Sequence, residues 1–148
     1  MVHTKKDLTN QLSHLLADSY SLYLKTQNFH WNVTGIHFVS LHSLFEKQYT
    51  ELASAIDEIA EQIRALGAHA PGSYAAFIKL SKIKDESGNP KDKEMIQQLL
   101  NGQKIVIETA QKCLKIADDI NDATTADLAT RRLDVHETSL WMLRSLLE

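Results

Sequence analysis

Residues 38–66 read FVSLHSLFEKQYTELASAIDEIAEQIRAL, and this stretch decides the fold. Apolar residues recur in it at steps of three and four, which is the spacing of one amphipathic helix. The helix carries His42 near its start, and two carboxylates, Asp57 and Glu61, near its end. Helical geometry brings Asp57 to within about 60° of His42 around the axis, but leaves the two about 22 Å apart along it.

Imidazole and carboxylate groups together suit ferrous iron, manganese or zinc, but the ligands of one ion lie within a few ångströms of each other. These three residues are therefore either unrelated or brought together from two chains. A second copy of the helix, antiparallel to the first and related by a two-fold axis near Tyr49 and Thr50, would bring its Asp57 and Glu61 to His42 of the first copy. The alternative for the two carboxylates is a solvated acidic helix face.

The remainder of the chain also shows helical periodicity. Apolar stripes mark three further long helices, over residues 8–29, 96–117 and 128–147. Residues 71–90 form a long connection in which residues 74–80 fit a short helix. Four long helices with one long connection, between the second and the third, predict an all-α, ferritin-like four-helix bundle with a short helix in that connection. No linker divides the chain, so we expect one domain over residues 1–148.

Several residues predict where the helices begin and end. Thr4 and Asp7 have the spacing of a capping box at the first helix. Gly35 and Gly67 are expected to end the first and second helices. Residues 121–125 form a tight corner before the last helix, with Thr124 as the candidate N-cap.

Composition narrows the class of protein. The net charge of −3 gives no electrostatic reason to bind nucleic acid or an anionic membrane. The single cysteine, Cys113, fits a reducing compartment such as the cytoplasm. Residues 1–10 are polar and charged, so we expect no secretory signal, and no apolar run reaches membrane-spanning length.

His30 and His42 stand at equal sequence distance from Ile36, near the centre of the first turn. Residues equidistant from the turn of a helical hairpin face each other, so the two imidazoles are predicted to meet. Alternatively, each packs or caps at its own helix end. The chain contains no Glu-x-x-His, the motif of di-iron sites inside ferritin-like bundles. That absence favours a site at an interface over one in the bundle core.

These residues lie within a longer pattern. It comprises the run HWNVTG (30–35), then Phe38, LH (41–42), FE (45–46), DEIAE (57–61), IR (63–64) and LG (66–67). Later, HE (136–137) and WMLR (141–144) follow. Together they resemble the Dps family, the miniferritins, over essentially the whole chain.

The resemblance implies a homododecameric hollow shell that oxidises Fe²⁺ to Fe³⁺, preferably with hydrogen peroxide, and stores the ferric product. Such a protein is a ferroxidase-type oxidoreductase with iron as both cofactor and substrate. His30 and His42 would come from one subunit and Asp57 and Glu61 from its mate. Glu46 would be a further acidic group at the site. Trp31 would lie beside it and take up oxidising equivalents, or pack at the interface.

The chain departs from the family pattern in two respects. Gln62 stands where arginine is frequent in the family. Many members also carry a lysine-rich tail that binds DNA, whereas here only Lys5 and Lys6 precede the first helix and Glu148 follows the last. Lysines of the long connection are interleaved with acidic residues. We therefore expect weak DNA binding or none. We also expect the protein to lie in the cytoplasm, either free or associated with the nucleoid.

Asp118, Asp119, Asp122 and Asp127 gather at the corner between the last two helices. In a three-fold arrangement they would form an acidic funnel that attracts Fe²⁺, which is how the family uses this corner. The alternative is helix capping, and Asp127 suits the start of the last helix.

Two other functions compete with iron oxidation. One is a nucleoid-associated DNA-binding protein with secondary iron chemistry, which the missing basic tail disfavours. The other is a helical scaffold without metal, which the matched histidines and paired carboxylates disfavour.

Overall fold

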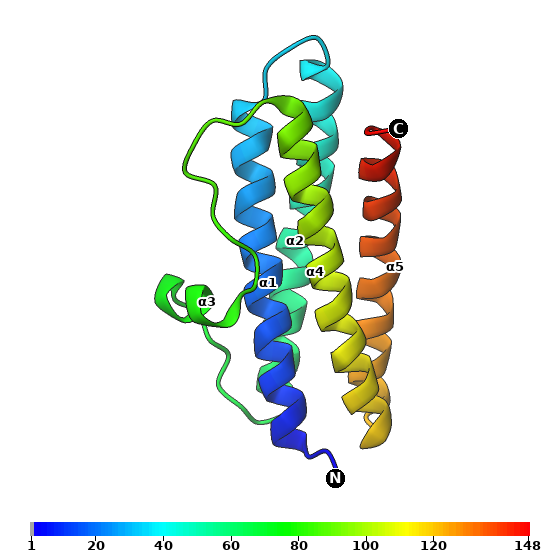
Figure 1. Ribbon diagram of the computed structural model, residues 1–148. Coiled ribbons are helices and arrows are strands. Elements are labelled where there is room, and N and C mark those ends of the chain that lie inside the picture. The colour runs from blue at the N-terminus through cyan, green and yellow to red at the C-terminus, as the bar shows by residue number, and fades with distance from the viewer. Residues whose placement is uncertain (1) are drawn as a thin grey trace.

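The computed structural model describes residues 2–148, and most of this part of the chain is helical (Figure 1). The helices are α1 (Lys5–Asn32), α2 (Phe38–Ala65), α3 (Tyr74–Leu80), α4 (Asp92–Asp119) and α5 (Ala123–Ser145). No strand occurs within residues 2–148. The predicted all-α class and the short helix in the long connection are both confirmed. Over the same residues, no helix is apolar enough over a sufficient length to cross a membrane.

The four long helices form two antiparallel hairpins. α1 pairs with α2, α4 pairs with α5, and α1 packs against α4. The connection that contains α3 returns along the bundle from the end of α2 to the start of α4, so α2 and α4 run in the same direction (Figure 1). This single long crossover is typical of ferritin-like bundles, and the predicted architecture is confirmed.

The ends of the helices follow local chemistry. At the start of α1, the Asp7 N–H donates to Thr4 Oγ1 at 3.2 Å and the Thr4 N–H donates to Asp7 Oδ2 at 2.7 Å, which confirms the capping box. Gly35 has a φ of +111°, a value that favours glycine in the first turn. The prediction that Thr124 caps α5 was wrong. Asn121 turns the chain with a φ of 58°, so Asp122 precedes the helix and accepts from the Thr125 N–H at 2.9 Å.

The apolar stripes meet in one continuous core. Its largest fully buried side chains include Phe29 of α1 and Phe45 of α2. Gly102 allows α4 to approach α1 closely, because a Cβ atom at this position would lie 2.7 Å from Leu22 Cδ1. The core therefore holds α1, α2 and α4 in a fixed relation, and this relation places the residues of the candidate site.

A buried carboxylate fastens the long connection to the bundle. Asp18 of α1 is 1% exposed. It accepts hydrogen bonds from Ser81 Oγ at 3.0 Å, from the Lys82 N–H at 2.8 Å and from Thr109 Oγ1 at 2.7 Å. One side chain thus joins α1, the segment after α3, and α4. Burying a carboxylate is unfavourable without such partners, so the site depends on all three donors.

We predict that Asp18→Ala lowers the free energy of unfolding by about 3 kcal/mol, because three donors lose their acceptor in a buried site. Urea unfolding followed by circular dichroism, at matched protein concentration, measures the change. Asp134→Ala is the control, since Asp134 is exposed on α5. Equal unfolding midpoints for the two variants would show that Asp18 contributes no such stability.

Candidate metal centre

The two histidines predicted to meet lie face to face at the α1–α2 hairpin. Their ring centroids are 3.8 Å apart and the ring planes differ by 14°. His30 lies in the last turn of α1 and is buried, whereas His42 lies in the second turn of α2 and is partly exposed. The prediction from sequence symmetry is therefore confirmed.

Each imidazole donates to the backbone of the other residue. His30 Nδ1 lies 2.7 Å from the His42 carbonyl oxygen, and His42 Nδ1 lies 2.7 Å from the His30 carbonyl oxygen. A carbonyl oxygen only accepts, so the proton of each neutral ring is on Nδ1 and the lone pair is on Nε2. Neither Nε2 atom has a hydrogen-bond partner within residues 2–148. Backbone-anchored Nδ1–H with a free Nε2 is the arrangement that metal-binding histidines use.

Two aromatic rings enclose the histidine pair. Phe38 stacks on His42 with centroids 5.0 Å apart, and Tyr49 meets His30 edge to face at 5.2 Å. The sequence analysis did not assign either ring to the site. The signal was available, because Phe38 lies one turn before His42 and Tyr49 lies two turns after it on the same helical face. Phe38 and the two histidines are thus stacked, and Tyr49 closes the group edge to face, so both imidazoles are held in place.

The carboxylates lie at the other end of α2. Asp57 and Glu61 are both exposed and share a helix face. The hydrogen bond with the Asp57 carboxyl, together with the charge of that group, raises the pKa of Glu61. Because α2 is continuous from Phe38 to Ala65, the axial separation of about 22 Å from His42 holds within one chain.

No group of three or more His, Cys, Asp or Glu residues in the described part of the chain is placed to hold a metal. Glu46 is exposed one turn after His42, and Trp31 is 60% exposed beside His30 in the sequence. A single chain thus carries an imidazole pair with Glu46 nearby, and a carboxylate pair far from it. Their union within one subunit is excluded by the length of the helix.

The bundle interior contains a different polar cluster. His136 of α5 is 1% exposed; its Nδ1 lies 2.6 Å from Gln103 Oε1 and its Nε2 lies 3.0 Å from Arg132 Nη2. Arg132 in turn donates to both carboxylate oxygens of Glu51. The guanidinium already neutralises this carboxylate and occupies the acceptor nitrogen of the histidine. These interior groups therefore bind one another, although Arg132 Nε has no hydrogen-bond partner among the described residues.

Most aspartates of the acidic corner have protein partners. Asp122 caps α5, and Asp127 accepts from Arg131 at 2.9 Å. Asp119 pairs with His3 at 2.7 Å, and this hydrogen bond is the main cause that lowers the pKa of Asp119. Asp118 is exposed, with no side-chain hydrogen bond to the described residues. The predicted helix capping is thus confirmed for Asp122. It was wrong for Asp127, because α5 begins at Ala123 and Asp127 lies beyond its first turn. Asp118 remains open to solvent.

Comparison with known proteins agrees with this fold. A model of the ferritin-like domain family matches residues 9–148. The DNA protection during starvation protein of Brevibacillus brevis is 33% identical over 137 residues, which cover 93% of this chain and 92% of that protein. A low temperature-induced protein of Nostoc sp. is 37% identical over 146 residues, covering 97% of this chain and 82% of that protein.

Solved structures give the same result. The Dps protein of Vibrio cholerae O1, a member of a broad superfamily of ferritin-like diiron-carboxylate proteins, superposes with a TM-score of 0.94 at 32% identity. The match covers 97% of this chain and 91% of that one. The Dps protein of Bacillus brevis gives 0.94 at 31% identity, with 97% of each chain covered. The fold is therefore that of a ferritin-like protein. Within this class of proteins, the chain belongs to the Dps family.

The His136 network generates a prediction about acid stability. Burial, followed by the charge of Arg132, lowers the pKa of His136 to about 3 from an ordinary 6.5. Between these two values the unfolded chain binds the proton and the folded chain does not. The stability that this group contributes is complete above about pH 6.5 and is lost as the pH falls toward 3, at up to about 1.4 kcal/mol per pH unit.

His136→Gln should remove that component, so the free energy of unfolding of the variant should fall less steeply between about pH 6.5 and about pH 4. Urea unfolding at a series of pH values measures both slopes. His69→Gln is the control, because His69 is exposed in the connection after α2. Parallel slopes for the wild type and His136→Gln would contradict the prediction.

Proposed function

We propose that this protein is a miniferritin that oxidises Fe²⁺ at sites shared between two-fold-related subunits and stores the ferric product in a homododecameric shell. His30 and His42 of one subunit and Asp57 and Glu61 of its mate bind the iron. The observation that carries the proposal is the histidine pair, whose Nδ1 atoms are anchored on backbone carbonyls and whose Nε2 lone pairs are free. Membership of the Dps family supports the role in iron storage and protection.

The donor set suits the substrate. Neutral imidazole and carboxylate oxygen are good ligands for ferrous iron. The hydrogen bond with Asp57, followed by the charge of that carboxyl group, raises the pKa of Glu61. A cation placed between the two carboxylates relieves their repulsion. Glu46 would add a further carboxylate beside His42. Oxidation of two ferrous ions supplies the two electrons that reduce one hydrogen peroxide, with two protons, to two waters. The protein contributes ligand placement and so limits release of hydroxyl radicals.

Exposed apolar side chains support assembly. Near the histidine pair, Trp31 is 60% exposed, Ile36 92% and Val39 76%. On α3, Tyr74 and Ile78 are exposed to a similar degree. Apolar groups gathered in this way are typical of surfaces covered by another subunit. A two-fold interface is isologous, so it completes two sites at once.

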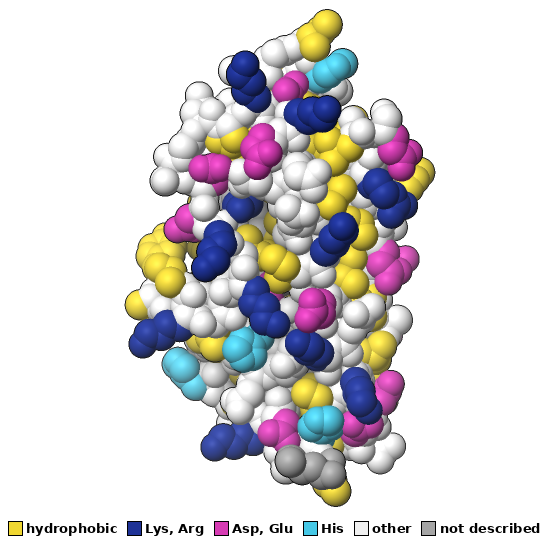
Figure 2. Space-filling model, viewed as in Figure 1, with side chains coloured by type: hydrophobic (Ala, Val, Ile, Leu, Met, Phe, Trp, Pro, Cys, Tyr) yellow, Lys and Arg dark blue, Asp and Glu magenta, His cyan; other side chains and the backbone are white. Residues whose placement is uncertain are grey.

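The charge of the surface does not favour the nucleic-acid alternative. On the face drawn in Figure 2, Lys and Arg side chains are interspersed with Asp and Glu. Around the long connection, Lys84 is followed directly by Asp85 and Glu86. Affinity for duplex DNA depends largely on neutralisation of phosphates by basic groups. We therefore propose that this chain binds DNA weakly, if at all, at physiological salt.

The shared site can be tested by complementation. One variant carries His30→Ala with His42→Ala, and another carries Asp57→Ala with Glu61→Ala. Each alone should lose fast peroxide-driven iron oxidation, because every site in its assembly is half-built. After co-assembly, half of the two-fold pairs are mixed, and each mixed pair contains one complete site. About a quarter of the wild-type activity should therefore return.

Stopped-flow absorbance of ferric iron measures the activity, and native mass spectrometry verifies the mixed shells. The matched control co-assembles the histidine variant with a second histidine variant carrying a silent affinity tag, which restores nothing. A verified mixed assembly without activity would exclude the shared site.

The acidic corner is proposed to attract Fe²⁺ toward the interior of the shell. Replacement of Asp118, Asp122 and Asp127 by Asn removes three charges, while asparagine still caps α5 at position 122. Iron uptake should slow by roughly tenfold at low ionic strength and by less at high ionic strength, since the field is screened. Asp134→Asn, which removes an exposed charge elsewhere on α5, is the control. Equal uptake rates would leave the corner with capping and ion pairing only.

A further inference from the structure

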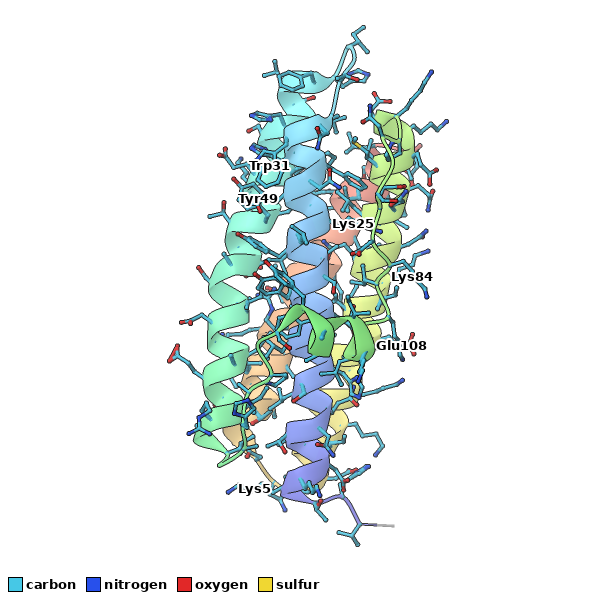
Figure 3. All side chains as sticks on the ribbon, turned by 90° about the vertical axis from the view of Figure 1, so that its left-hand side faces the viewer. Lys5, Lys25, Trp31, Tyr49, Lys84 and Glu108 are labelled. Atoms are coloured by element: carbon cyan, nitrogen blue, oxygen red, sulfur yellow. The ribbon has the colours of Figure 1, made fainter. Side chains whose placement is uncertain are left out.

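A series of three tyrosines begins at the histidine pair. Tyr49 of α2 meets His30 edge to face at a centroid distance of 5.2 Å. Tyr49 meets Tyr23 of α1 at 5.9 Å, and Tyr23 meets Tyr20 at 5.7 Å. All three rings are partly buried. Figure 3 shows Tyr49 on α2 at nearly the same height along the bundle as Trp31 of α1.

The series has a defined beginning and end. Beyond Tyr20 the next ring is Phe77 of α3, stacked at 4.9 Å. Phenylalanine lacks the hydroxyl group that makes tyrosine oxidisable, so an oxidising equivalent that enters at Tyr49 can reach Tyr20 and go no further. Gln27 Nε2 donates to the Tyr23 hydroxyl oxygen at 3.4 Å. The fourth tyrosine, Tyr74, is 73% exposed on α3 and contacts no ring of the series.

The stoichiometry of peroxide reduction can require an electron donor other than iron, and the tyrosines can serve as that donor. Hydrogen peroxide takes two electrons, whereas each Fe²⁺ supplies one. When a site holds a single Fe²⁺, one-electron reduction of peroxide yields hydroxide and a hydroxyl radical. A nearby group that gives up one electron and one proton completes the reduction to water. Tyrosine is such a group, because its phenol loses both together.

We propose that Tyr49, Tyr23 and Tyr20 form a redox relay that supplies the second electron when one Fe²⁺ at the histidine pair meets hydrogen peroxide. The relay rests on the proposed iron oxidation. The first step converts Fe²⁺, the Tyr49 phenol, hydrogen peroxide and one solvent proton into Fe³⁺, the Tyr49 phenoxyl radical and two waters. The radical then passes to Tyr23 and Tyr20 by one-electron transfer between neighbouring rings, while their protons exchange with solvent. A later Fe²⁺ with one proton restores the phenol and leaves as Fe³⁺.

Ring contacts favour Tyr49 over Trp31 as the first donor. Trp31 is 60% exposed and makes no ring contact with either histidine in the described chain. Tyr49 touches His30 directly, and electron transfer slows steeply with distance. A radical on Tyr49 also has two partly buried tyrosines behind it, so the oxidising equivalent moves away from the iron and from solvent.

The test uses assembled protein loaded with less than one Fe²⁺ per site and then mixed with excess hydrogen peroxide. Freeze-quench electron paramagnetic resonance detects the radical, and ring-deuterated tyrosine assigns it through the narrowed hyperfine pattern. A spin trap measures released hydroxyl radicals, and absorbance measures ferric iron in the same samples. The variants are Tyr49→Phe, the Tyr20→Phe and Tyr23→Phe double variant, and the matched control Tyr74→Phe. Each keeps its aromatic ring and therefore the packing.

The wild type and Tyr74→Phe should give equal tyrosyl signals and little trapped hydroxyl radical. Tyr49→Phe should lose most of the tyrosyl signal and release more hydroxyl radical. The double variant should keep the signal, because Tyr49 is the first member. A full tyrosyl signal in Tyr49→Phe, or a signal in the wild type that deuterated tyrosine leaves unchanged, would overturn the relay. Absence of ferric iron in the wild type would overturn the proposed function itself, which separates the two failures.

Discussion

The fixed rise of one uninterrupted helix is the constraint on which the rest of this structure depends. α2 runs from Phe38 to Ala65 without a break, so His42 and Asp57 cannot approach each other in the same chain. The imidazoles lie at one end of the helix and the paired carboxylates at the other. In the proposed function, these groups are two halves of one metal site. An antiparallel copy of the helix would unite them, so the proposal links iron chemistry to assembly.

The hairpin between α1 and α2 turns one of those halves into a rigid donor pair. A helix leaves its last carbonyl groups without intrahelical partners, and the His30 carbonyl accepts from His42 instead. The reciprocal bond from His30 fixes the second ring. The same two bonds set the tautomer of both imidazoles and expose both Nε2 atoms. Phe38 and Tyr49 hold the rings from either side. Helix termination, packing and ligand orientation thus depend on the same few atoms.

The bundle interior illustrates the opposite use of polar groups. Glu51, Arg132, His136 and Gln103 are hydrogen-bonded to one another across α2, α4 and α5. A buried arginine already paired with a carboxylate disfavours a cation at the same place. Ferritin-like bundles that bind iron in the core place carboxylates and histidines there. Here the interior polar groups bind one another, and the proposed iron site lies instead at the hairpin of α1 and α2, where Tyr49, Tyr23 and Tyr20 follow the histidines.

Sequence periodicity alone located the helices, because apolar spacing reports directly on which face of a helix is buried. It predicted α2 to within one residue, and the symmetry of His30 and His42 about the turn predicted their meeting. The tertiary structure decided what depends on residues distant in the chain. Asp18 meets Ser81, His136 meets Gln103, and His3 meets Asp119, and no local pattern encodes these pairs. The N-cap of α5 is Asp122 and not the predicted Thr124, because the left-handed conformation of Asn121 sets where that helix begins. Local spacing determines which face is buried, whereas the partner of a polar side chain is set by how the helices pack.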